Sequence, residues 1–384
     1  MRYRRDLARP RFARRTFLRS GVALAGATAT GGVLAGCGEE RPARDVFVGP
    51  DSDRIRAVEA ARRGGRTVSA RLVAAPDEID LGGPIVSTWT FGGRLPGREL
   101  RLSVGSVLAV RLDNTLPGDT TVHWHGVALR NDADGVPGVT QQRVRPGSHF
   151  DYRFTVSHPG TYWFHPHTGT QLDRGLYAPL IIEDPDEPLR YDDEWVVILD
   201  DWMDGVTGTP DDVFAELSRG MNHAGTGGMN HGMKHGDHGG GVTPSPSDPT
   251  SSGHALAGAH SELLGPDPGD VRYPYHLING RVAAAPDSYR GRPGTRLRIR
   301  FVNAGADTAF RVALGGHKMT VTHTDGFPVE PFPTDALLLG MGERYDVLVT
   351  LGDGVFPLVG LAEGKDATAL ALVRTGAGSA PEVG

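Results

Sequence analysis

The chain has 384 residues, a net charge of −6 at pH 7 and a single cysteine. This length is enough for two domains of ordinary size. The acidic balance argues against nucleic acid as a partner and is compatible with metal cations or small organic substrates. A single cysteine excludes a disulfide bond within the chain.

The first 37 residues have the pattern of an export signal. They contain the segment Arg14-Arg15-Thr16-Phe17-Leu18-Arg19, followed by an uncharged apolar run over 21–36 that is shorter than the roughly 20 residues of a membrane-spanning helix. The run ends in Leu34-Ala35-Gly36-Cys37, which resembles a lipoprotein box after a twin-arginine signal. We expect export by the twin-arginine route, with Cys37 lipid-anchored at the outer face of the cytoplasmic membrane. The alternative is a disordered basic tail.

Removing this segment makes the rest of the chain more acidic. Residues 1–36 hold eight arginines and one aspartate, a charge of +7, and subtracting it from −6 leaves −13. Residues 38–65 are expected to be a linker, in which 55–63 is the best candidate for a short helix. Long amphipathic helices are not expected elsewhere.

Short β-type runs separated by turn residues dominate the rest of the chain, which contains most of the 54 glycines and 28 prolines. Many of these runs alternate apolar and polar residues, as Leu100-Arg101-Leu102-Ser103-Val104 does. Such runs predict half-buried antiparallel strands and an all-β sandwich fold. The expected strands lie in residues 100–114, 149–156, 160–165, 176–183, 194–199, 296–302, 317–323 and 344–351.

The runs fall into two successive domains, which we expect at 66–185 and 194–376. The second domain contains a Gly/Ser/Pro-rich insertion at 219–270, which, like 1–45, is expected to be poorly ordered. Thioether and imidazole suit Cu(I) and Cu(II) respectively, so the insertion is either a copper-binding segment or a flexible linker. Its Met and His residues are Met221, His223, Met229, His231, Met233, His235 and His238.

Two His-x-His pairs lie at the ends of predicted strands. Because residues i and i+2 of a strand share a face, His123 and His125 should point one way and Trp124 the other. The second pair, His165 and His167, flanks a proline, which favours a strand end. Four imidazoles brought together would suit copper, zinc or nickel.

The flanks of these pairs carry a family resemblance. They read Thr121-Val122-His123-Trp124-His125-Gly126, Asp134-Gly135-Val136-Pro137-Gly138-Val139-Thr140-Gln141 and Gly160-Thr161-Tyr162-Trp163-Phe164-His165-Pro166-His167. These segments resemble the first two copper motifs of multicopper oxidases, the group of laccases, ascorbate oxidase and cuprous oxidases. The resemblance continues through 173–182, 277–281 and 296–303, so it covers about 66–374. It implies two tandem cupredoxin-like Greek-key β-sandwiches.

The resemblance also implies roles for individual residues. His123 would bind a type 2 copper, His125 and His165 would share one type 3 copper, and His167 would bind the other. The family couples one-electron oxidation of phenols or Cu(I) to the reduction of oxygen to water. Asp134 matches the family acid that supplies protons beside the cluster; alternatively, it is a turn residue preceding a glycine.

The sequence also departs from the family pattern. The His-x-x-His-x-His and His-Cys-His motifs of a third domain do not occur, so four of eight cluster histidines are present. The type 1 copper, which needs a thiolate, is not encoded because the only cysteine lies in the signal. We therefore expect a chain truncated after its second domain, inactive alone and completed by a third domain or another chain.

Three other functions are alternatives to this interpretation. A non-catalytic exported copper-binding or scaffold protein of the same fold is the main alternative. A copper nitrite reductase is disfavoured by the absent cysteine ligand. A zinc hydrolase is disfavoured because no carboxylate completes a ligand set near either pair. His317 and His323, expected on one face of a strand, are predicted to be core or surface residues rather than ligands.

Overall fold

The computed structural model describes residues 49–379 except 50, 63, 225–252, 257–258 and 267, and it gives only the backbone of 220–224. The predicted export signal, Cys37 and the methionine and histidine side chains of 221–238 therefore lie outside the described residues. No helix among the described residues is long and apolar enough to cross a membrane.

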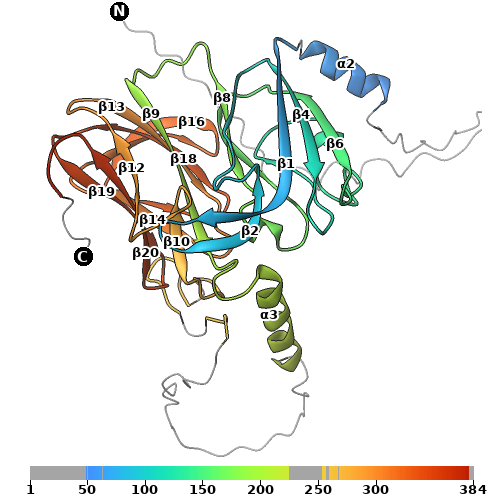
Figure 1. Cartoon of the computed structure of the whole chain (residues 1–384). Coiled ribbons are helices and arrows are strands. Elements are labelled where there is room, and N and C mark those ends of the chain that lie inside the picture. Colours follow the sequence, from blue (N-terminus) through green and yellow to red (C-terminus); the bar gives the residue numbers. More distant parts are fainter. Residues whose placement is uncertain are drawn as a thin grey trace, which may run out of the picture. The chain divides into compact units, whose positions relative to one another are not determined.

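The first β-sandwich has two four-stranded sheets, in the orders β2-β1-β4-β6 and β3-β8-β7-β5. It is the blue and green part of Figure 1. Trp124, Tyr152, Phe154 and Phe164 are buried between its sheets. Its strands are β1 (Thr67–Asp80), β2 (Ile85–Phe91), β3 (Leu100–Ser103), β4 (Val107–Asn114), β5 (His123–His125), β6 (His149–Thr155), β7 (Gly160–His165) and β8 (Ala178–Glu183).

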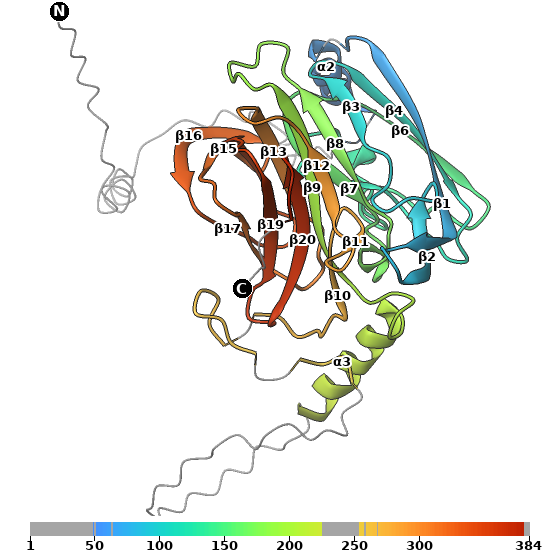
Figure 2. The same cartoon turned by 60° about the vertical axis from the view of Figure 1, so that its left-hand side comes forward.

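The second β-sandwich packs a seven-stranded sheet, β11-β10-β9-β13-β18-β15-β16, against a five-stranded one, β12-β20-β19-β14-β17. Figure 2 shows these two sheets from the side. The strands are β9 (Asp193–Trp202), β10 (Tyr275–Ile278), β11 (Arg281–Val282), β12 (Asp287–Arg290), β13 (Arg296–Asn303), β14 (Phe310–Leu314), β15 (Met319–Thr324), β16 (Phe327–Thr334), β17 (Leu337–Leu339), β18 (Arg344–Thr350), β19 (Val355–Ala362) and β20 (Ala367–Arg374).

The all-β prediction is confirmed, but the strand pairing is mixed. The pairs β1/β4, β3/β8, β9/β13 and β12/β20 are parallel, so the expectation of purely antiparallel strands was wrong for them. Parallel neighbours need a crossover connection, and here the chain crosses through other strands of the sandwich. The run predicted at 100–114 is also two strands, separated at Gly105, whose φ of 82° an L side chain rarely adopts.

Two α-helices accompany the strands in the described part of the chain. Helix α2 (Asp53–Ala61) overlaps the predicted short helix. The 15-residue α3 (Pro210–Ala224) was missed. Its start nevertheless carries a local signal. The Thr209 amide donates to the Asp212 carboxylate at 2.9 Å, and the Asp212 amide donates to the Thr209 hydroxyl at 3.3 Å, with Pro210 as the first helical residue.

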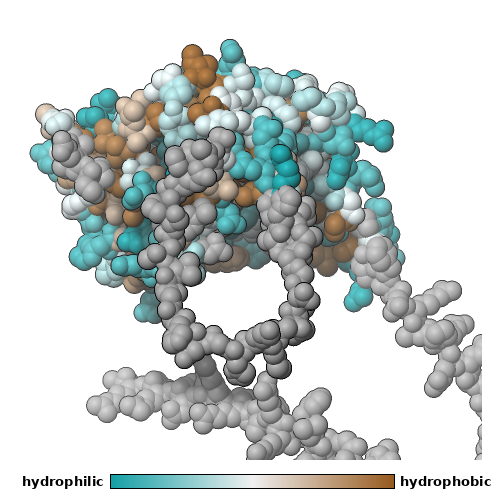
Figure 3. Space-filling model, turned by 90° about the horizontal axis from the view of Figure 1, so that it is seen from below, coloured by the Kyte–Doolittle hydropathy of each residue, from teal (hydrophilic) through white to brown (hydrophobic). Residues whose placement is uncertain are grey.

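The surface seen from below, where α3 lies, is chemically mixed. In Figure 3, brown hydrophobic groups and teal hydrophilic groups are interspersed over the described atoms of this face. Phe214 of α3 is 63% exposed, whereas Val213 packs in a small core cluster with Met203 and Tyr273.

A buried ionic network joins the two sandwiches. Asp346 on β18 is 1% exposed and accepts hydrogen bonds from Arg298 Nη2 at 2.5 Å and Arg300 Nη1 at 2.9 Å. It also accepts a bond of 2.6 Å from the hydroxyl of Thr161 on β7 of the first sandwich. Glu187, in the segment between the sandwiches, adds a contact of 2.9 Å to Arg298.

Removing the central carboxylate should therefore destabilise the fold strongly. We expect Asp346→Asn to lower the free energy of unfolding by about 3–5 kcal/mol, because two buried guanidinium groups lose a charged partner. Urea denaturation measures this. Asp335→Asn is the matched control, since Asp335 pairs with Lys318 at an exposed site and should cost no more than about 1 kcal/mol.

The effect of Asp346→Asn should also depend on pH. Burial opposes ionisation of Asp346, but the charges of Arg300 and Arg298 outweigh burial and hold its pKa below the usual value. A lowered pKa stabilises the folded state above the unfolded pKa of about 4, and this contribution is lost as the pH falls through the folded pKa. The stability difference between wild type and variant should shrink from pH 7 to pH 3, and an equal or larger difference at pH 3 would contradict the assignment.

Candidate metal centre

The candidate site is built on the antiparallel pair of strands β5 and β7. In their register, His123 lies opposite His165 and His125 lies opposite Trp163. Trp124, between the two histidines of β5, points the other way and is fully buried in the core of the first sandwich. Strand alternation thus places three imidazoles on one face of one strand pair.

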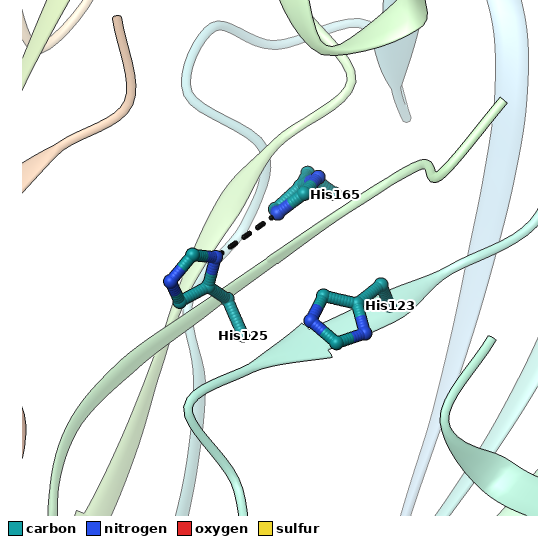
Figure 4. A group of neighbouring side chains, drawn as sticks. All are labelled: His123, His125 and His165. Carbon is teal, nitrogen blue, oxygen red and sulfur yellow. Dashed lines mark hydrogen bonds between the residues drawn. The ribbon is translucent and has the colours of Figure 1, made fainter. Parts of the chain in front are cut away.

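Three histidines lie close enough to act together. His123, His125 and His165 each offer a ring nitrogen, and these nitrogens lie within 4.8 Å of one another. The closest pair is His125 Nδ1 and His165 Nε2, 3.2 Å apart, shown by the dashed line in Figure 4. Two nitrogens bound to one ion at about 2.0 Å each lie roughly 3.2 Å apart at a tetrahedral angle, so this spacing fits a shared metal ion.

Backbone carbonyls fix the orientation of two of these rings. His165 Nδ1 lies 2.9 Å from the carbonyl oxygen of Pro166, and His123 Nδ1 lies 2.8 Å from that of Asp134. A carbonyl oxygen only accepts, so both Nδ1 atoms carry a proton. The Nε2 lone pairs of both rings are then free for a metal, the arrangement that second-shell partners give to metal-binding histidines.

The two closest histidines are neutral at ordinary pH. Burial, with a further effect from Arg344, lowers the pKa of His125 to about 3. Burial likewise lowers the pKa of His165 to about 3. Metal ions bind the neutral imidazole, and imidazole suits copper, zinc, iron and nickel. The donors present therefore fit copper.

His167 lies at the edge of the cluster. Its ring centroid is 4.7 Å from that of His123 and 5.6 Å from that of His165. It is exposed, whereas His165 is buried, and burial lowers its pKa too. The structure thus brings all four predicted histidines to one place, with His125 and His165 as the closest pair and His167 the most open to solvent.

Asp134 lies beside the same cluster. Its carboxylate oxygen Oδ1 is 3.3 Å from His123 Nδ1, in addition to the contact through its carbonyl. Its neighbour Gly135 has a φ of 80°, and a Cβ there would lie 1.8 Å from the carbonyl oxygen of Val122. The position is therefore both a turn that requires glycine and a place where a carboxylate meets the histidines.

Three neighbours of the cluster were not predicted. The Trp163 ring stacks on His125 and packs against His165, with centroids 4.9 and 4.4 Å away. It is two residues before His165, so strand alternation could have revealed it. Arg344 and Gly342 come from the second sandwich and had no signal in the sequence. A Cβ on Gly342 would lie 2.8 Å from the His125 ring, and Arg344 Nε donates to the Thr161 carbonyl at 3.2 Å.

His317 and His323 lie apart from the cluster. The expectation that they share a strand face was wrong, because His317 precedes β15 and the register of β15 shifts between Val321 and His323. His317 Nδ1 contacts the Gly315 carbonyl at 2.8 Å, and its Nε2 accepts from the Gly352 amide at 3.0 Å. His317 is therefore a structural residue, as predicted.

Comparison with known proteins assigns both sandwiches. Two family models described as "Multicopper oxidase" match residues 76–187 and 193–376. Multicopper oxidase MmcO of Mycobacterium tuberculosis is 50% identical over 97% of this chain, and copper resistance protein A of Escherichia coli is 32% identical over 72%. The chain's match covers 68% of the first relative's length but 45% of the second's.

Solved structures of multicopper oxidases have a similar fold. A multi-copper oxidase from Pseudomonas thermotolerans aligns with a TM-score of 0.60 and 28% identity, over 83% of this chain and 66% of that one. A laccase from Botrytis aclada aligns with a TM-score of 0.62 and 26% identity, over 82% of this chain and 54% of that one. The two sandwiches are thus cupredoxin-like, as predicted. With matching family models over both sandwiches and a relative that is 50% identical over 97% of this chain, the chain belongs to the multicopper oxidase family.

Proposed function

We propose that this chain supplies half of the histidine ligands of a trinuclear copper centre that couples one-electron oxidation of phenols or Cu(I) to the reduction of oxygen to water. The observation that supports this proposal most directly is the 3.2 Å separation of His125 Nδ1 and His165 Nε2, with His123 in the same group. A relative is named copper resistance protein A, which supports a role for this chain in handling copper.

Each of the four histidines would bind a particular copper ion. His123 would hold the type 2 copper, His125 and His165 would share one type 3 copper, and His167 would bind the other. Bound copper would carry electrons from the reducing substrate to oxygen. Trp163 covers the two shared ligands on one side and limits water there, since it is 1% exposed. Asp134, with its carboxylate 3.3 Å from His123 Nδ1, would deliver protons to the reaction.

The chain supplies only part of the copper ligands, so the proposed centre needs ligands from additional protein. A trinuclear centre of this family takes eight histidines, and its type 1 copper takes a thiolate. Four of these histidines are present here, and residues 38–384 contain no cysteine. The remaining ligands would come from a third domain or from another chain, which would face the open side of His167. A partial ligand set should bind copper loosely.

We expect a polypeptide of these 384 residues to bind copper through the cluster. The double variant His125→Ala/His165→Ala should lose the most tightly bound Cu(II) ion of the polypeptide, because the closest pair of donor nitrogens is removed. Equilibrium dialysis against a chelator series measures retention, and electron paramagnetic resonance reports nitrogen coupling to Cu(II).

His149→Ala is the matched control for this experiment. His149 is an exposed histidine at the start of β6, outside the cluster, so its removal should leave retention unchanged. If the double variant and the control retain equal copper with identical spectra, the copper lies elsewhere and the assigned site is wrong.

The same polypeptide should lack blue colour and oxidase activity. Type 1 colour requires a cysteine thiolate, and none follows Cys37. Absorption near the blue band and oxygen uptake with a phenol or Cu(I) should both stay at background. Adding, in the same reading frame, a domain with His-x-x-His-x-His and His-Cys-His motifs should restore both. A blue, active 384-residue chain would overturn the ligand count.

We also propose export by the twin-arginine route and a lipid anchor on Cys37. The support is the paired Arg14 and Arg15 before an uncharged run that ends at the cysteine. Arg14→Lys/Arg15→Lys should block export, and Cys37→Ala should release the protein into the soluble fraction. Immunoblots of cell fractions measure both, and full membrane retention of the Cys37→Ala variant would exclude the anchor.

A further inference from the structure

A cleft of about 630 Å³ lies beside the ionic network, away from the histidine cluster. It is bounded by the start of β7, by the segment joining the two sandwiches and by strands β15 and β16. Its volume is within the range of roughly 300–1,000 Å³ typical of small-molecule sites. Strand β7 runs from Gly160 at the cleft to His165 in the cluster, which separates the two places by about 17 Å.

The walls of the cleft are mainly apolar and partly flat. Tyr191 contributes an aromatic ring, and the Arg298 guanidinium lies 5.4 Å from its centroid. The remaining apolar wall includes Pro159, Pro185, Pro188, Leu189, Pro328 and Val329. Proline rings and an aromatic face suit a planar apolar ligand.

The charges at the cleft disfavour an anion. Its two arginines are already paired, Arg298 with Asp346 and Glu187, and Arg300 with Asp346 and with Glu194 at 2.6 Å. Glu183 and Asp184 add further negative charge to its lining. The cleft therefore lacks the free cation that an anionic ligand would need.

His323 gives the cleft a hydrogen-bond acceptor. The Thr322 hydroxyl donates to the Asp346 carbonyl at 3.1 Å, so its oxygen accepts from His323 Nδ1, also 3.1 Å away. The contact of Nδ1 with Arg298 Nη2 is long, at 3.5 Å, and that nitrogen bonds Asp346 at 2.5 Å. Burial lowers the pKa of His323, so the ring is neutral and its Nε2 is an acceptor. Nε2 has no hydrogen-bond partner within the described part of the chain.

Arg300, which also lines the cleft, has a buried atom without a partner among the residues that the structure describes. Arg300 Nε is buried and makes no hydrogen bond to any described residue, and Arg300 as a whole is 3% exposed. At the cleft, His323 Nε2 is thus an acceptor that lacks a donor among the described residues. The hydroxyl group of a bound ligand provides such a donor.

We propose that this cleft binds a small neutral aromatic alcohol, with its hydroxyl donating to His323 Nε2 and its ring lying against Tyr191 and the prolines. The site is separate from the proposed copper centre and requires no copper. Binding at this cleft can therefore be tested independently of the proposed oxidase function.

The test compares two ligands of the same ring, in one of which a methyl group replaces the hydroxyl hydrogen. Metal-free 384-residue protein is titrated with 2-naphthol and with 2-methoxynaphthalene, and ligand fluorescence reports binding. We expect saturable binding of one 2-naphthol per chain. Its dissociation constant should be at least tenfold lower than that of the methyl ether, which corresponds to a difference of about 1.4 kcal/mol in binding free energy. Equal affinities, or no saturable binding of 2-naphthol, would overturn the proposal.

Two variants locate the binding. His323→Phe should reduce 2-naphthol affinity to that of the methyl ether while leaving the ether unchanged. Val329→Trp should abolish binding of both ligands by filling the cleft, whereas Leu263→Trp adds the same side chain at a position that is 57% exposed and should change neither. Binding that survives Val329→Trp in a folded variant places the ligand elsewhere and rejects the site. If His323→Phe fails to fold, the ligand pair on the wild type still decides.

Discussion

The candidate metal centre depends on one constraint, the antiparallel register of β5 with β7. With His123 opposite His165, alternation places His125 and Trp163 on the same face and sends Trp124 into the core. A register shift of one residue would reverse every side chain and scatter the donors. The buried Trp124, packed edge-on against Phe154, resists such a shift because its burial would be lost.

The second sandwich completes the surroundings of the first sandwich's site. Arg344 lies near His125, and its charge adds to burial in keeping that imidazole neutral. Gly342 lets the backbone approach the His125 ring where any Cβ would clash. Arg344 itself is 4% exposed and donates to the Thr161 carbonyl. Neither sandwich alone would therefore reproduce the electrostatics of the cluster.

The sequence predicted the parts that depend on local periodicity. The β runs, the outward pairs at His123 and His165, and the turn at Asp134 all follow from residue alternation or turn chemistry. Helix α3 was missed although Thr209 and Asp212 form a capping pair, because its surroundings resemble a Gly-rich loop. The parallel strand pairs and the approach of Arg344 depend on contacts between distant segments, which no local pattern encodes.

Strand β7 connects the ionic network to the metal cluster. All six of its residues are buried, so neither face is free to vary. Tyr162 and Phe164 pack in the first core, while Thr161, Trp163 and His165 point the other way. On that second face, Thr161 donates a hydrogen bond to Asp346. Trp163 packs on Ile198 and Val302 of the second sandwich, and His165 offers a ligand nitrogen. Because a polar group buried without a partner is costly, the interface and the cluster constrain each other through this strand.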